Sequence, residues 1–107
     1  MRGGIPDVYY AGPKDDAWVE YKKIPALPKR ENTLIRPALS SLQKNALRKL
    51  DGFYIECRVA VYVESTKRYL IFQTPDDWEN GAVLDSLTIV KGHKGMAQHI
   101  LNMISEQ

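Results

Sequence analysis

The sequence is poor in cysteine and has no long apolar stretch. Cys57 is the only cysteine among 107 residues, which excludes an internal disulfide and a zinc site built from several cysteines. No apolar run approaches the ~20 residues that a membrane helix needs, and no apolar segment near Met1 resembles a secretory signal. We therefore expect one domain spanning residues 1–107, in a reducing cytoplasm and not in a membrane.

Acidic residues are almost absent from residues 22–50. This segment carries eight lysines and arginines against Glu31 alone, a net charge of +7, whereas the rest of the chain has a net charge of −5. A basic segment beside an acidic remainder is typical of a surface that binds a polyanion, although solvated lysines produce the same pattern. The candidate phosphate contacts are Arg30, Arg36, Lys44 and Arg48.

Hydrophobic periodicity predicts an α/β domain with a mixed sheet of about four strands and flanking helices. The first two strands, over residues 5–11 and 17–24, are separated by a dense turn signal and are expected to form an antiparallel hairpin. Residues 54–64 alternate almost without fault and predict a third strand, which is followed by a fourth over residues 68–73. Residues 82–91 fit no single element.

Three helices are expected as well. The first follows a proline-rich basic loop, opens at a capping box of Ser40 and Gln43, and is closed by Gly52. A short helix begins after Thr74, which precedes a proline, and a third helix covers residues 95–105. The predicted buried faces are Leu42, Ala46, Leu47 and Leu50 in the first helix, and Met96, Ile100, Leu101 and Ile104 in the last.

Charged side chains of the first hairpin are expected to converge. Glu20 and Lys22 share a face because they lie two positions apart in a strand, and the turn can bring Asp7 opposite them. Two carboxylates and one ammonium form a costly cluster unless a cation compensates it, and Mg²⁺ (or Mn²⁺) is a cation that accepts such oxygens. Asp7, Glu20 and the carbonyl of Tyr21 are the predicted ligands. Trp18 shares this face by parity, where it either packs or stacks on a base.

This set of residues suits hydrolysis of a phosphodiester without a covalent intermediate. The metal would lower the pKa of a bound water, and Lys22 would orient that water or neutralise charge in the transition state. The alternative is structural: Glu20 and Lys22 would form a surface ion pair worth roughly 0–1 kcal/mol, and Asp7 would only begin a strand.

The order of the motifs resembles the PD-(D/E)XK nuclease superfamily and, within it, the VRR-NUC group of small phage and bacterial nucleases. The resemblance covers about residues 3–63 and rests on Gly4-Ile5-Pro6-Asp7, Glu20-Tyr21-Lys22, Leu39-Ser40-Ser41-Leu42-Gln43 and the strand through Val59-Ala60-Val61. It implies a restriction-endonuclease-like fold and an Mg²⁺-dependent deoxyribonuclease. Asp7 and Glu20 match the metal-binding acids, and Lys22 matches the catalytic lysine. Gln43 matches a glutamine that contacts substrate or a metal-bound water, although it also fits the capping box.

One departure from the family pattern shapes further expectations. Family members usually carry a helix before the first motif, which supplies another acid, whereas only Met1 to Gly4 precede it here. We therefore expect one metal rather than two, and a homodimer that covers the open flank of the sheet. The resemblance further implies branched or junction DNA as a substrate. Two alternatives stay open: an inactive nucleic-acid-binding module on the same scaffold, and an interaction protein with an incidental acidic cluster.

Overall fold

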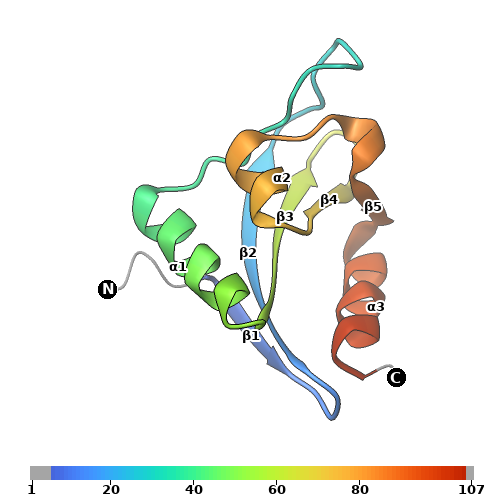
Figure 1. Cartoon of the computed structure of the whole chain (residues 1–107). Coiled ribbons are helices and arrows are strands. Elements are labelled where there is room, and N and C mark those ends of the chain that lie inside the picture. Colours follow the sequence, from blue (N-terminus) through green and yellow to red (C-terminus); the bar gives the residue numbers. More distant parts are fainter. Residues whose placement is uncertain (1–5, 106–107) are drawn as a thin grey trace.

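A five-stranded mixed sheet forms the centre of the molecule (Figure 1). The computed structural model describes residues 6–105, so Gly4 and Ile5 of the first motif lie outside the described residues. The strands stand in chain order across the sheet, and the β2–β3 pair is parallel while the other three pairs are antiparallel. The strands are β1 (Val8–Ala11), β2 (Asp16–Ile24), β3 (Glu56–Val63), β4 (Arg68–Phe72) and β5 (Thr88–Lys91).

The predicted α/β class and the first hairpin are confirmed, and the ambiguous segment supplies the fifth strand. Three α-helices flank the sheet within residues 6–105: α1 (Ser41–Gly52), α2 (Pro75–Asn80) and α3 (Gly92–Ser105), with a short 3-10 helix, η1 (Leu84–Ser86), before β5. The long connection between the parallel strands β2 and β3 contains α1, as parallel pairing requires. No helix of the described range is long and apolar enough to cross a membrane.

The two faces of the sheet bury separate apolar clusters. The face that α1 and α2 cover, here called the α1 face, packs Leu47 and Trp78 against alternate residues of β3. The opposite face, here called the α3 face, packs Met96 and Ile100 against Val19 and its neighbours. Side chains of β2 and β3 therefore point alternately into one cluster and the other, which explains the strict alternation of the β3 sequence.

The capping box of α1 is present. The Gln43 amide donates to the Ser40 hydroxyl at 3.1 Å, and the Ser40 amide donates to Gln43 Oε1 at 3.0 Å. The predicted burial of Leu42 is wrong, because its side chain is 63% exposed and Gln43 faces the sheet instead. Gly52 is the last helical residue, and the left-handed conformation that ends the helix occurs at Tyr54, with φ of 61°.

Helix α3 is anchored to the first hairpin. The predicted burial of Leu101 is wrong, since its side chain is 50% exposed while Met96, Ile100 and Ile104 form the buried stripe at four-residue spacing. The carbonyl of Ile104 accepts from two backbone amides of the β1–β2 turn, at 3.0 and 3.2 Å. A Cβ at Gly12 would meet that carbonyl oxygen at 2.5 Å, so only glycine permits this approach.

Candidate active site

Strand β2 places Glu20 and Lys22 on the α1 face, as its parity predicts. Glu20 is only 2% exposed, and its Oε2 lies 3.4 Å from Lys22 Nζ. The Lys22 side chain is 26% exposed and therefore reaches from this buried carboxylate to solvent. The pair is thus not the solvent-exposed ion pair of the structural alternative, because one of its partners lies in the protein interior.

Asp7 comes next to this pair from the neighbouring strand. It directly precedes β1, and continuing the Val8–Val19 register places it opposite Glu20. Its Oδ2 accepts a hydrogen bond of 3.0 Å from the backbone amide of Tyr21. In a strand the carbonyl of a residue points to the same side as its amide, so the Tyr21 carbonyl is directed toward Asp7 as well.

Gln43 connects helix α1 to the charged cluster. Its Nε2 donates to Glu20 Oε2 at 3.1 Å, and its Oε1 accepts from Lys22 Nζ at 3.3 Å. The same Oε1 accepts from the Ser40 amide, so capping and contact with the cluster occur together. The two interpretations of Gln43 are therefore compatible, and the capping box holds this side chain in place.

The electrostatics of the cluster are unbalanced. Burial raises the pKa of Glu20 above its ordinary value and the charge of Asp7 raises it further, whereas Lys22 and the backbone of Asp7 lower it. Glu20 Oε1 is buried and has no hydrogen-bond partner among residues 6–105. Two carboxylates, one of them with a free buried oxygen, thus stand against a single ammonium, and an added cation would supply the missing partner.

The oxygen donors of the cluster fit a hard divalent cation that needs few protein ligands. Mg²⁺ binds through one or two carboxylates and keeps waters on its remaining positions, and the cluster offers Asp7, Glu20 and the Tyr21 carbonyl. Within residues 6–105 no group of three or more His, Cys, Asp or Glu side chains is placed to hold a metal ion. A third protein oxygen would therefore come from an uncharged group, and the candidate is the backbone carbonyl of Tyr21.

The four candidate phosphate contacts have different surroundings. Arg48 forms an ion pair with Glu79 that uses both its Nε and its Nη2, so its charge is already compensated. The guanidinium of Arg36 donates to the carbonyl of Asn80 at 3.2 Å. Arg30 and Lys44 have no ion-pair partner within residues 6–105. Of the four candidates, those without an ion-pair partner within residues 6–105 therefore lie on the loop before α1 and in the first turn of that helix.

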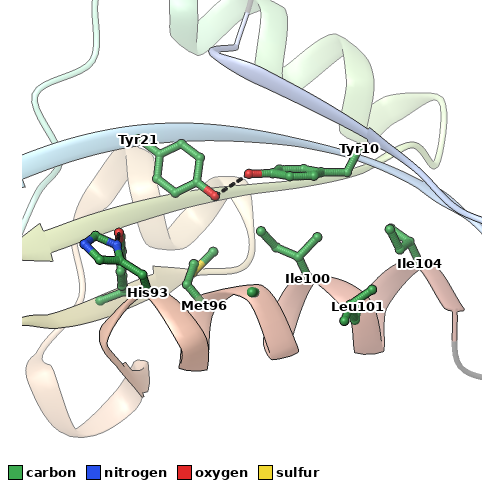
Figure 2. A pocket seen from close by; sticks show the side chains of 9 residues that line it. Tyr10, Tyr21, His93, Met96, Ile100, Leu101 and Ile104 are labelled. Atoms are coloured by element: carbon green, nitrogen blue, oxygen red, sulfur yellow. Dashed lines mark hydrogen bonds between the residues drawn. The ribbon is translucent and has the colours of Figure 1, made fainter.

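A cavity of about 450 Å³ lies on the other side of the sheet, against α3 (Figure 2). The hydroxyls of Tyr10 and Tyr21 meet there at 2.7 Å, and Tyr69 bonds to His93 Nδ1 at 2.7 Å. Tyr21 thus serves both faces, since its backbone lies in the charged cluster and its ring lines this cavity. The sequence does not predict this cavity. The alternation of Tyr21 with Glu20 and Lys22 in the strand does indicate that the Tyr21 ring points to the opposite face of the sheet.

Comparison with protein-family models, with curated proteins and with solved structures finds no match to this chain. The geometry and chemistry of the residues themselves must therefore indicate the function.

Proposed function

We propose that this protein hydrolyses DNA phosphodiester bonds with Mg²⁺ or Mn²⁺ bound by Asp7, Glu20 and the carbonyl of Tyr21. The observation that carries the proposal is the buried carboxylate of Glu20, whose Oε1 has no partner within residues 6–105 while a second carboxylate lies beside it. Burying such a group costs free energy, and a bound cation would repay it.

The side chains around Glu20 have different roles in the proposed reaction. A cation bound there would lower the pKa of a coordinated water and offset negative charge on the phosphate. Gln43 holds Glu20 Oε2 in position through its Nε2. Lys22 sits between the buried carboxylate and solvent, where its ammonium can contact a phosphate oxygen or position the attacking water.

The charge distribution supports a nucleic acid as substrate. The loop over residues 25–39 leaves β2 directly after the cluster and leads to the start of α1 (Figure 1). It carries Arg30 and Arg36, and Lys44 follows in the first turn of the helix. Phosphate contacts from these residues would position the duplex without reading its sequence and would make binding depend on salt.

Cleavage of plasmid and branched DNA in Mg²⁺, Mn²⁺ or EDTA tests the proposal. We expect cleavage by the wild type in either metal and none in EDTA, and its loss in Asp7→Asn and Lys22→Met. The matched control is Lys23→Met, because Lys23 is the adjacent lysine but is 67% exposed and paired with Glu64. Equal cleavage by all four proteins would refute the site.

A second candidate function is a non-enzymatic nucleic-acid-binding module. The observation that favours it is the lack of a third acidic side chain in the cluster, as judged over residues 6–105. This function predicts salt-dependent DNA binding that survives Asp7→Asn, with no cleavage in any metal. The homodimer proposal is tested on the same samples by sedimentation equilibrium, which gives the mass of the particle directly.

A further inference from the structure

An apolar hollow of about 340 Å³ lies between the first hairpin and α1, beside the charged cluster. We name it the Trp18 hollow, and its lining consists of Pro6, Trp18, Ala46, Lys49, Leu50 and Phe53. Trp18 precedes Glu20 by two positions on the α1 face, roughly 7 Å along the strand. The hollow is therefore within one nucleotide of the carboxylates, and Pro6 directly precedes Asp7.

The rim of the Trp18 hollow carries an unusually exposed aromatic side chain. Phe53 ends α1 with 75% of its surface exposed, although an apolar ring of this size normally packs. Lys49 is the charged residue in the lining and forms no ion pair within residues 6–105. The hollow thus combines an apolar and aromatic lining with a lysine that has no ion-pair partner within residues 6–105.

A second hollow on the other side of Trp18 has the opposite charge. It has a volume of about 440 Å³, and Asp15 and Asp16 line it together with Tyr9 and Tyr54. Tyr54 is 95% exposed, so this hollow also presents an aromatic ring. Its carboxylates would repel a phosphate backbone, whereas Lys49 on the Trp18 hollow would attract one. Charge therefore distinguishes two otherwise similar aromatic surfaces.

We infer that the Trp18 hollow holds an unpaired base of the nucleic acid, so that the substrate has a single-stranded segment beside the cleaved bond. A base has two apolar faces that stack on aromatic rings whatever its identity. In a duplex both faces are already stacked on neighbouring bases, so only an unpaired or flipped base can enter the hollow. The position beside a cleaved bond rests on the proposed nuclease function, whereas the preference for unpaired bases rests only on nucleic-acid binding, which both candidate functions share.

Binding of a labelled single-stranded oligonucleotide and of the same sequence as a duplex, measured by fluorescence anisotropy in EDTA, tests the inference. Phe53→Ala is expected to weaken single-strand binding by about fivefold to a hundredfold, which corresponds to one lost stacked base, and to leave duplex binding unchanged. Phe53→Trp should bind the single strand and the duplex as the wild type does, because the larger ring can still stack on a base. Tyr54→Asn is the matched control on the acidic hollow, since asparagine tolerates the positive φ of 61° there, and it should leave both affinities unchanged.

Several results would overturn the inference. Unchanged single-strand affinity in Phe53→Ala, equal loss for single strand and duplex, or an equal loss in Tyr54→Asn would each do so. A change of oligomeric state in Phe53→Ala without an effect on DNA would assign the hollow to a second copy of this chain. Cleavage in Mg²⁺ separates the two proposals: cleavage with the same preference in Phe53→Ala and wild type refutes only the base site, whereas an inactive wild type with the expected binding refutes only the nuclease.

Discussion

The charged cluster on the α1 face and the tyrosine pair on the α3 face differ in how their polar groups are satisfied. On the α1 face, Glu20 is a buried carboxylate with one unpartnered oxygen within residues 6–105 and a second carboxylate nearby. On the α3 face, the hydroxyls of Tyr10 and Tyr21 satisfy one another, and both are neutral groups. One strand, β2, serves both faces by alternation. The tyrosine hydroxyls in the cavity against α3 thus have hydrogen-bond partners, whereas one carboxylate oxygen of the cluster has none within residues 6–105, so the cluster is where an added cation would be stabilised.

The largest expected effect is on the rate of DNA cleavage, and it distinguishes Lys22 from the adjacent β2 residue Tyr21. If the proposed nuclease mechanism holds, Lys22→Met lowers the rate of DNA cleavage by about 10²- to 10³-fold, since that mechanism uses the Lys22 charge to stabilise the transition state. Tyr21→Phe should leave the rate unchanged, because the backbone groups of Tyr21 remain and only a hydroxyl on the α3 face is lost. Initial rates with plasmid DNA and Mg²⁺ measure both. Comparable losses would mean that the cavity is coupled to the cluster.

The next effect concerns the packing of α3 on its face of the sheet. Ile100→Ala should lower the free energy of unfolding by about 2–4 kcal/mol, because it leaves a cavity in the cluster that holds α3. Leu101→Ala should change it by less than about 0.5 kcal/mol, since that side chain is half exposed. Urea denaturation measures both variants. A larger loss in Leu101→Ala would show that α3 is rotated from the position described above.

A third test uses the pH dependence of stability on the α1 face. The pKa of Glu20 is raised by burial and by Asp7, so between its ordinary and its raised value the folded protein retains a proton that the unfolded chain loses. The free energy of unfolding therefore falls as pH rises through that window. Glu20→Gln should be more stable than wild type by about 1 kcal/mol at neutral pH, because the buried charge is gone.

That gain should disappear below the ordinary glutamate pKa of about 4.3, where the wild-type carboxyl is protonated in both states. Under the proposed metal site, added Mg²⁺ should raise the stability of the wild type at neutral pH and leave Glu20→Gln unchanged, because the proposal requires the ionised Glu20 carboxylate for cation binding. Urea titrations at several pH values give the free energies of unfolding of the wild type and of Glu20→Gln, each with and without Mg²⁺. A wild type that stays more stable than Glu20→Gln at neutral pH would contradict the electrostatic imbalance.

Much of the fold could be predicted because its signals are local. The alternation over residues 54–64 and the capping box of Ser40 and Gln43 depend on neighbours in the sequence; the capping box is present, and the strand covers Glu56–Val63 of the predicted range. Strand β5 could not be predicted, since its four residues pair only with β4 and carry too little pattern of their own. The predicted burial of Leu42 and Leu101 is wrong because the apolar spacing of a helix does not show how the helix is rotated about its axis on the sheet.

In the candidate site as well, some features follow from local sequence and others depend on tertiary packing. The shared face of Glu20 and Lys22 follows from strand parity, and the place of Asp7 follows from the hairpin register. The degree of burial of Glu20 and the contact of Gln43 with the cluster depend on how closely α1 approaches β2, which no local pattern encodes. The hydroxyl bond between Tyr10 and Tyr21 likewise depends on the spacing of two strands.

The smallest effect tests the hydroxyl pair itself. Tyr10→Phe should lower the free energy of unfolding by about 1 kcal/mol, because it leaves the partly buried Tyr21 hydroxyl without its partner at 2.7 Å. The double variant Tyr10→Phe/Tyr21→Phe should cost less than the sum of the single losses, since no orphaned hydroxyl remains. Burial raises the pKa of Tyr21, and the Tyr10 hydroxyl raises it further, so stability should also fall as pH rises above the ordinary tyrosine value. The difference between spectrophotometric titrations of the wild type and Tyr21→Phe should therefore show Tyr21 ionising only as the protein unfolds in alkali. Additive losses in the double variant would mean that the two hydroxyls bond to solvent rather than to each other.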